Sequence, residues 1–255
     1  MMIDPALAEK WSGEPRFAVI IPTYNHGGRV AAVARQALSL GCPVFLIDDG
    51  STDDTRLRLR SVSGINLLVH AQNRGKGAAL VTGMRAAADV ADYAVTIDAD
   101  GQHDPVDALK LMAAIPADRR VIVVGRREMA DAPWTSRQGR HFSNFWVRAS
   151  GGPKLTDSQS GFRIYPLPET LNLGVVARRY QFEVEVLARA AWRGIPVREA
   201  TISADYGSAL PRISHFHPFV DFMRNFGAFS RLITRRVFTP ALWSPGVRRD
   251  RSDRR

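Results

Sequence analysis

Apolar runs alternate with segments of helical periodicity along the first half of the chain. Five runs lack the polar alternation of a half-exposed strand, and each of the first four precedes a stretch with helical spacing. Such runs are typical of strands buried on both faces, and intervening helices favour parallel pairing with right-handed crossovers. The pattern predicts an α/β fold with a doubly wound, mostly parallel sheet, whose first strands cover residues 17–21, 44–48, 66–70, 93–98 and 121–125.

The pattern is less regular after Phe142. Residues 162–166 and 195–203 read as two further strands, with a helix predicted between them over residues 180–194. No linker-like or repeated stretch interrupts the chain before Pro211. We therefore expect the elements up to this proline to form one domain.

Domain boundaries follow from this pattern. The predicted domain covers residues 17–210, and residues 1–16 form an N-terminal extension. Residues 240–255 form a basic tail that we expect to be disordered. Between them, residues 211–239 are expected to form an amphipathic helical segment, whose apolar positions are Phe219, Phe222, Phe226, Phe229 and Ile233.

Four polar segments begin where the first four strands are predicted to end. They are residues 22–28, 48–55, 71–77 and 98–104, all rich in glycine or in acidic residues. The carboxyl ends of parallel strands lie at one edge of a sheet, and ligands of such folds bind there. Four loops of this composition at one edge predict a ligand site.

Two carboxylates one residue apart, Asp98 and Asp100, follow the fourth strand in the sequence IDADGQHDP. A turn with a helix cap explains part of this composition, because Asp, Gly and Pro favour turns. A divalent cation explains the pair, because Mg²⁺ takes one or two carboxylates and completes its coordination with phosphate oxygens and water. Gln102 adds a neutral oxygen within reach. Both interpretations are open at this point.

A second acidic pair, Asp48 and Asp49, ends the second strand in DDGSTDDT. Capping by Ser51 or Thr52 explains the residues that follow, but not a second carboxylate at the end of a buried strand. Such a pair could accept hydrogen bonds from a base edge or a ribose. The segment NRGKG lacks the G-x-x-x-x-G-K-[ST] spacing, and G-x-G-x-x-G is absent, which excludes the P-loop and the dinucleotide-binding motif.

The net charge of +10 is weighted toward the C-terminus, where the last nine residues hold five arginines and two aspartates. Such a balance suits nucleic acid, an anionic membrane or phosphorylated substrates. A nucleic-acid-binding protein or a non-catalytic nucleotide-binding protein is therefore a competing class. Acidic side chains at the predicted edge would repel a nucleic-acid backbone, so no nucleic acid is expected as a partner.

Cysteine content and the length of the apolar runs bear on location. A single cysteine, Cys42, excludes a disulfide framework and fits a reducing compartment. No run approaches the ~20 apolar residues of a membrane span, and the N-terminus lacks the pattern of a signal peptide. We expect a cytoplasmic protein.

Five motifs in register resemble glycosyltransferase family 2. They are VIIPTYNHGG, LIDDGSTDDT, NRGKGAAL, IDADGQHDP and DSQSGFRIYP, within residues 17–205. Their order and spacing are similar to those of dolichyl-phosphate mannose synthase and other polyprenyl-phosphate glycosyltransferases. The resemblance implies a GT-A fold, which is a Rossmann-like doubly wound sheet. It also implies sugar transfer from a UDP- or GDP-linked donor, with Mg²⁺ or Mn²⁺ as cofactor.

The first four motifs would form the donor site. The residues that the resemblance places around the nucleotide sugar are Pro22, Tyr24, Asn25, Asp48, Asp49, Gly75, Lys76, Gly77 and Asp98. Asp98, Asp100 and Gln102 would hold the metal against the diphosphate, where a cation neutralises the leaving group, and Asp100 thereby counts as catalytic. Arg126 matches a family position that faces phosphates.

The last motif would form the acceptor side, through Gly161, Phe162, Arg163 and, in the following helix, Glu185. The family's reaction is a single displacement with inversion at the sugar carbon. A hydroxyl acceptor needs a general base, for which Asp157 is the candidate, whereas a phosphate acceptor is already ionised and needs none. Asp157 reads equally well as a loop aspartate that bonds backbone amides.

The segment after the last strand departs from the mannose synthase pattern, which places an arginine and then S-K-L there to bind phosphate. This chain reads RISHF, so Arg212 and Ser214 are acceptor-side candidates while His215 and Phe216 replace lysine and leucine. RISHF resembles bacterial members of the family associated with aryl-polyene or xanthomonadin-type pigment lipids. The expected acceptor is therefore a lipid or lipid-linked molecule, with polyprenyl phosphate as one candidate.

The amphipathic segment bears on where a lipid acceptor would be met. Its phenylalanines either pack on the domain or lie at the boundary of a bilayer, with arginines toward anionic headgroups. The second alternative places the protein peripherally on the inner face of the cell membrane. A nucleotidyltransferase that uses the same acidic metal site is the competing enzyme, and it would release pyrophosphate instead of a nucleoside diphosphate.

Overall fold

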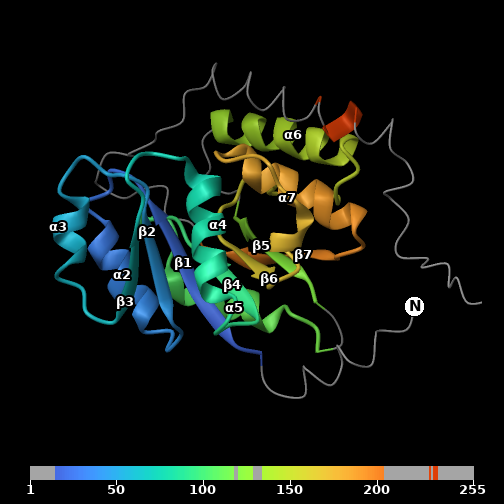
Figure 1. The fold of residues 1–255 in the computed structure, drawn as a ribbon. Coiled ribbons are helices and arrows are strands. Elements are labelled where there is room, and N and C mark those ends of the chain that lie inside the picture. The colour runs from blue at the N-terminus through green and yellow to red at the C-terminus, as the bar shows by residue number, and fades with distance from the viewer. Residues whose placement is uncertain (1–14, 118–119, 129–133, 204–229, 231, 235–255) are drawn as a thin grey trace, which may run out of the picture.

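The structure is a computed structural model of the 255-residue chain and describes residues 15–117, 120–128, 134–203, 230 and 232–234 (Figure 1). Its strands are β1 (Phe17–Thr23), β2 (Val44–Asp48), β3 (Ile65–Val69), β4 (Tyr93–Thr96), β5 (Ile122–Arg127), β6 (Arg163–Pro166) and β7 (Val197–Ile202). Its helices are α2 (Val30–Leu38), α3 (Thr55–Leu59), α4 (Lys76–Ala87), α5 (Ala108–Ala113), α6 (Trp134–Ala149) and α7 (Gln181–Trp192), with 3₁₀ turns η1 (Pro105–Asp107) and η2 (Leu171–Leu173).

The seven strands of the described chain form one sheet in the order β3-β2-β1-β4-β6-β5-β7. Pairing is parallel throughout β3-β2-β1-β4 and between β5 and β7, whereas β6 is antiparallel to both of its neighbours. The predicted α/β fold with a mostly parallel sheet is confirmed. The reversed strand β6 is the part of the topology that the apolar pattern does not indicate.

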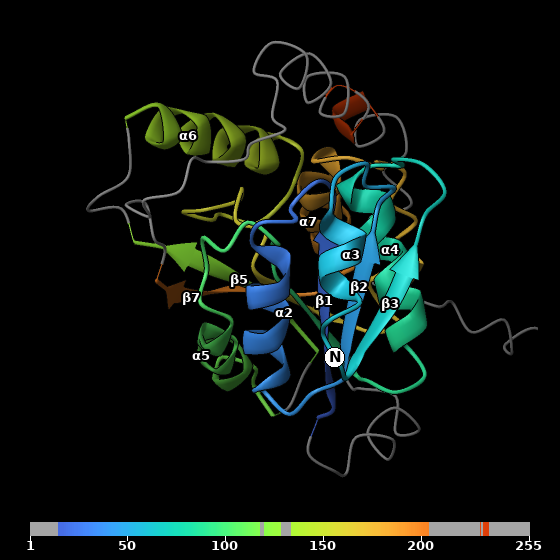
Figure 2. The same ribbon diagram turned by 90° about the vertical axis from the view of Figure 1, so that its left-hand side faces the viewer.

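Helices cover both faces of the sheet because alternate strand residues point to opposite sides. Ile20 of β1 belongs to a core with Leu80 of α4 and Phe182 of α7. Its neighbour Val19 belongs to a second core with Val33 of α2. Figures 1 and 2 show the sheet between these layers, with α2 and α5 on one face and α4 on the other. Burial on both faces accounts for the unbroken apolar runs in the sequence.

The carboxyl edge is the edge of the sheet at which β1–β5 and β7 end. Because β6 runs the other way, it begins at this edge, next to the end of β4, where Thr96 pairs with Arg163. Thr96 Oγ1 also donates to the Gly161 carbonyl oxygen (2.8 Å). The segment before β6 therefore lies beside the residues that follow β4. The fifth sequence motif is thus at the same edge of the sheet as the first four.

Several expectations fall outside the described residues. The N-terminal extension before residue 15, the basic tail and most of the amphipathic segment, including Arg212, Ser214 and the four phenylalanines, are among them. From that segment, Ser230 and residues 232–234 are helical, and Leu232 is buried. Within the described chain, no helix combines the length and the apolar character that crossing a bilayer requires.

Candidate active site

Two loops at the carboxyl edge, those after β1 and β2, are joined by Asn25 and Asp48. The Asn25 N–H donates to Ser51 Oγ (3.0 Å), and its side-chain oxygen accepts the Thr52 N–H (2.8 Å). Asp48 is fully buried, accepts the Ser51 N–H (2.8 Å) and pairs with Arg56 Nε (3.0 Å). Both side chains therefore fix the shape of the edge, and their contact with a base or ribose stays a prediction.

The remaining predicted residues of the first motif lie at the same place. Pro22 is buried inside β1, where it pairs with Ile47 of β2. Tyr24 follows the end of β1 and is half-buried. Tyr24 is thus the aromatic ring that the fold places at the edge beside Asn25.

Asp49 ties the end of β2 to the NRGKG segment. Its carboxylate accepts the N–H groups of Arg74 (3.0 Å) and Gly75 (2.7 Å), and one of its oxygens lies 2.6 Å from His70 Nδ1. The other ring nitrogen of His70 lies 3.0 Å from Thr82 Oγ1 on α4. Asp49 is 2 % exposed, so these contacts occupy a carboxylate that has almost no access to water. His70 is a residue that the motif analysis missed, although it is the last residue of a predicted strand and directly follows the observed β3.

Lys76, the first residue of α4, joins three parts of the chain through two ion pairs. Its Nζ lies 2.6 Å from Asp98 Oδ1 after β4 and 2.6 Å from Glu183 Oε1 in the first turn of α7. Burial opposes the charged form of Lys76, but the attraction of Asp98 and Glu183 outweighs it and raises the pKa of the lysine above its ordinary value. Burial likewise would raise the pKa of Asp98, yet the ammonium beside it holds that pKa below its ordinary value. Lys76 and Asp98 are therefore both ionised at neutral pH.

Gly161 is the point where the acceptor-side motif touches this network. A β-carbon at Gly161 would lie 2.5 Å from Asp98 Oδ2 and 2.6 Å from Lys76 Nζ. Only a residue without a side chain lets the backbone come so near to the ion pair. The close contact with Asp98 and Lys76 therefore explains why the GFR motif has glycine at this position.

Asp100 lies in the turn after β4, where its Oδ1 accepts the Gln102 N–H (3.0 Å) and its carbonyl oxygen accepts a bond from Arg29 Nη1 (2.6 Å). Asp98, Asp100 and Gln102 are all partly accessible. Among the described residues, no cluster of three or more His, Cys, Asp or Glu side chains forms a protein-only metal cage. A partly open set of carboxylate and amide oxygens fits Mg²⁺ or Mn²⁺, which complete their coordination with phosphate oxygens and water, and does not fit a structural zinc site.

A second charged cluster lies around Asp157, on the predicted acceptor side. Arg127, at the end of β5, donates through Nε (2.7 Å) and Nη2 (2.8 Å) to the two carboxylate oxygens, and Arg140 Nη1 of α6 lies 3.7 Å from Oδ2. Burial would raise the pKa of Asp157, but the hydrogen bonds and charges of these arginines hold it below its ordinary value. Arg126, one residue earlier, points to the opposite side of β5, is exposed, and bonds Thr201 (2.7 Å).

Two further predicted acceptor-side residues of the described chain, Phe162 and Arg163, are buried. The Phe162 ring is fully covered and lies 5.6 Å from the His103 ring, whose pKa burial lowers more than Asp98 raises it. Arg163 is fully buried and donates to the carbonyl oxygens of Ser158 (2.8 Å), Ser160 (2.6 Å) and Glu183 (2.7 Å). Its position explains the shape of the segment before β6, and contact with an acceptor stays a prediction.

Glu185 and Glu183 face different parts of the protein. Glu185 accepts the N–H groups of Val176 (3.2 Å) and Ala177 (3.0 Å) and pairs with Arg189 (2.6 Å), so it holds the segment before α7. Side chains two positions apart on an α-helix point in directions that differ by about 200°. Only one of Glu183 and Glu185 can therefore reach Lys76. The structure brings Glu183 to the donor-side network and leaves the predicted Glu185 in contact with other residues.

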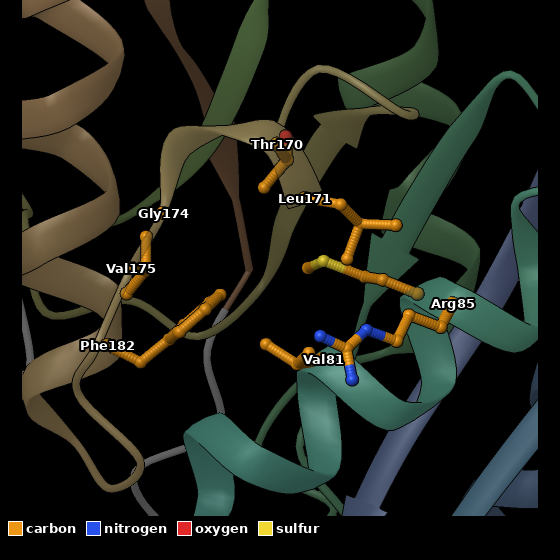
Figure 3. A pocket seen from close by; sticks show the side chains of 8 residues that line it. Val81, Arg85, Thr170, Leu171, Gly174, Val175 and Phe182 are labelled. Carbon is orange, nitrogen blue, oxygen red and sulfur yellow. The ribbon is translucent and has the colours of Figure 1, made fainter.

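A cavity of about 140 Å³ lies between α4, residues 170–175 and the start of α7 (Figure 3). Val81 and Met84 of α4 and Phe182 of α7 line it, together with Arg85. None of the predicted site residues is in its wall. The predicted site residues lie at the carboxyl edge of the sheet. This cavity lies instead between the helices that cover one face of the sheet.

Comparison with protein families decides which of the candidate functional classes this protein belongs to. The family model for "Glycosyl transferase family 2" matches residues 18–168, which is more than half of the chain. The chain belongs to glycosyltransferase family 2. As a member, it is a nucleotide-sugar glycosyltransferase, which sets aside the nucleic-acid-binding and non-catalytic alternatives.

Two relatives of this family 2 glycosyltransferase have names that refer to dolichyl phosphate or to a polyprenol monophosphate sugar. UDP-N-acetylglucosamine–dolichyl-phosphate N-acetylglucosaminyltransferase of Methanococcus voltae is 30% identical over 213 residues, covering 74% of this chain and 85% of that protein. Polyprenol monophosphomannose synthase of Mycolicibacterium smegmatis is 27% identical over 207 residues, covering 74% and 77%.

Solved structures support the GT-A-like fold of the glycosyltransferase. Glucosyl-3-phosphoglycerate synthase of Mycobacterium tuberculosis, in complex with Mn²⁺, UDP-glucose and phosphoglyceric acid, matches with a TM-score of 0.64 and 18% identity, covering 91% of this chain and 84% of that one. The same enzyme with Mg²⁺ and UDP gives a TM-score of 0.63 at 20% identity, covering 94% and 84%. At this level of identity the likeness concerns the fold.

Gly161→Ala is expected to impair nucleotide binding or turnover by about tenfold or more, with a smaller loss of thermal stability than Gly77→Ala causes. The added methyl group would displace the Asp98 carboxylate and the Lys76 ammonium, which are the ends of flexible side chains, and small misplacements in a site are costly. Nucleotide titration and a thermal melt measure the two effects. Gly77→Ala is the matched control, since its methyl group would meet Phe182 Cβ at 2.6 Å and the backbone of Arg178, and it should destabilise the fold by ~1–3 kcal/mol.

Asp157→Asn is expected to destabilise the protein by about 3 kcal/mol at neutral pH, because it leaves Arg127 and Arg140 without their carboxylate. The pKa of Asp157 is lowered in the folded state, so its stabilisation is complete above the unfolded pKa of about 3.9 and is lost as pH falls through the folded pKa. The melting temperatures of the two proteins should differ equally at pH 7 and pH 5, and the difference should begin to shrink only below about pH 3.9. A difference that vanished already at pH 5 would contradict this assignment.

Proposed function

We propose that this enzyme transfers a sugar from a UDP- or GDP-linked donor to a lipid phosphate or another lipid-linked acceptor at the cytoplasmic face of a membrane. The observation that carries the proposal is the arrangement at the carboxyl edge, where the carboxylates after β4 and the arginine cluster around Asp157 flank the segment before β6. The relatives that act on dolichyl and polyprenol phosphates support the class of acceptor. Pigment-type lipids remain acceptors of the same broader class.

The donor side would bind the nucleotide sugar with the loops after β1–β4. Tyr24, Asn25 and the acidic pair at the end of β2 would lie near the base and ribose, and Lys76 near the diphosphate. Asp98, Asp100 and Gln102 would hold Mg²⁺ or Mn²⁺, which when bound supplies positive charge to the departing nucleoside diphosphate. These residues need little rearrangement to do so, because backbone hydrogen bonds already fix their loops.

The acceptor side is better suited to an ionised nucleophile than to a hydroxyl. A general base needs a pKa near the working pH and an oxygen that is free to take a proton. Asp157 has a lowered pKa and gives both oxygens to Arg127. A phosphate acceptor attacks without losing a proton, and Arg127 and Arg140 would offset its charge. We therefore propose that Asp157 positions arginines on the acceptor side instead of acting as the base.

Helix α6 supports contact with an anionic membrane. Its inner face contributes the buried residues Arg140, Ser143 and Val147, whereas Phe145 is 64% exposed and Arg148 is also exposed. The 16-residue sequence of α6 contains no acidic residue. Aromatic and basic side chains on one face of a helix are typical of helices that lie in a membrane interface. The proposed location is accordingly peripheral, on the inner face of the cell membrane.

Incubation with a panel of nucleotide sugars and polyprenyl phosphate should release UDP or GDP only when Mg²⁺ or Mn²⁺ is present. Asp100→Asn should reduce turnover about a hundredfold, which corresponds to ~2.7 kcal/mol. Asp104→Asn is the control, because Asp104 lies in the same loop but is exposed and caps η1, a task that asparagine also performs. Release of pyrophosphate from nucleoside triphosphates would instead favour a nucleotidyltransferase, and full activity of Asp100→Asn would remove the metal assignment.

Phe145→Ser is expected to weaken binding to vesicles of phosphatidylcholine and phosphatidylglycerol roughly tenfold, since burying such a ring is worth about 1.5–3 kcal/mol. Co-sedimentation measures the binding, and thermal stability should not change because the side chain is exposed. Leu109→Ser is the matched control: Leu109 is 53% exposed on α5, which lies far from α6 in both views (Figures 1 and 2). Equal binding by Phe145→Ser and the unaltered protein would exclude α6 as the contact.

A further inference from the structure

We propose that Glu183 is a positioning residue of the donor site, which shares the Lys76 ammonium and so keeps negative charge on Asp98 for the metal-bound nucleotide. The inference rests on the proposed donor and metal site. It assigns a role to a residue in the acceptor-side helix α7 that lies outside the motif residues of the donor loops. Glu183 would act through Lys76 and Asp98 and would not itself touch the reacting atoms.

The geometry places one cation between two carboxylates. Lys76 Nζ lies 2.6 Å from Asp98 Oδ1 and 2.6 Å from Glu183 Oε1, while Asp98 is the more accessible partner, with 27% of its side chain exposed against 8% for Glu183. The accessible carboxylate is therefore the one at the ligand edge, and the covered carboxylate lies behind the lysine. This arrangement suits a role in which Asp98 contacts the ligand and Glu183 positions Lys76.

The formal charges of Lys76, Asp98 and Glu183 sum to −1. Without Glu183, Lys76 would neutralise Asp98 alone, and the network would have no net charge next to the proposed metal site. With Glu183, the ammonium is divided between two carboxylates, and the net negative charge remains where a divalent cation would bind. Charges a few ångströms apart in a partly buried site interact strongly enough to change ion affinity about tenfold.

Glu183 is itself held in place by the protein. Its backbone carbonyl accepts a bond from Arg163 Nη1 (2.7 Å), and Arg163 also bonds the carbonyl oxygens of Ser158 and Ser160. The preceding residue, Phe182, packs against Gly77 and lines the cavity of Figure 3. The first turn of α7 is thus fixed against both α4 and the segment before β6. The Glu183 carboxylate on this turn therefore holds the Lys76 ammonium in a defined position.

The sign of the effect separates positioning by charge from a purely structural role. Glu183→Gln removes one negative charge with little change of shape. Mn²⁺ binding in the presence of UDP, measured by electron paramagnetic resonance, should weaken roughly tenfold, whereas UDP binding without metal should stay equal or become tighter, because the site has lost a charge that repels phosphate. Isothermal titration measures the second quantity, with GDP as a parallel probe. Glu183→Asp keeps the charge and should restore most of the Mn²⁺ affinity.

Two comparisons make the test decisive. Glu169→Gln also breaks a glutamate–arginine ion pair, with Arg120, but away from the edge, and should leave both affinities unchanged. If Glu183→Gln weakens Mn²⁺ and metal-free UDP equally, or weakens neither, the positioning role is wrong although the proposed function stands. If the unaltered protein binds neither UDP nor GDP, with or without Mn²⁺, the proposed function fails and this inference fails with it.

Discussion

The ammonium group of Lys76 holds together segments that lie far apart in the sequence. It begins α4, contacts the carboxylate that follows β4, and contacts a second carboxylate in the first turn of α7. The backbone before β6 passes so close to the ammonium that a side chain at Gly161 would displace it. The segments predicted to form the donor and acceptor sides therefore meet at one charged group, and the geometry of the edge depends on that group being charged and enclosed.

Other buried charges at the edge follow the same physical rule. A buried carboxylate is tolerated only when hydrogen bonds and opposite charge replace its water. Asp49 satisfies this condition with backbone N–H groups and His70, and Asp157 does so with two arginines. Each carboxylate also fixes a loop or a strand end. The charged groups that set the electrostatic potential of the carboxyl edge therefore also fix its structure. Few of these side chains would have to move when substrate binds.

The acceptor side depends on α6 in a comparable way. Its inner face contacts the segment around Asp157, where Asn144 Oδ1 accepts the Ser158 N–H (2.9 Å) and Arg140 lies beside the carboxylate. Its outer face presents Phe145 and Arg148. In the proposed function, α6 would therefore meet lipid with its outer face and support the acceptor segment with its inner face. Docking of the outer face would set the distance between the membrane and the edge.

Local pattern in the sequence determined the α/β class, the first five strands and the set of polar loops at one edge, because the periodicity of burial and turn chemistry are properties of short segments. It also located Asp98, Asp100, Lys76 and Gly161 through motifs. It could not show that β6 is reversed, since strand direction depends on the path of the whole chain between β5 and β6. Nor could it choose Glu183 over Glu185 or pair Asp157 with Arg127. Those contacts join residues distant in sequence, and only the packing of α7 and β5 against the edge decides which side chains meet.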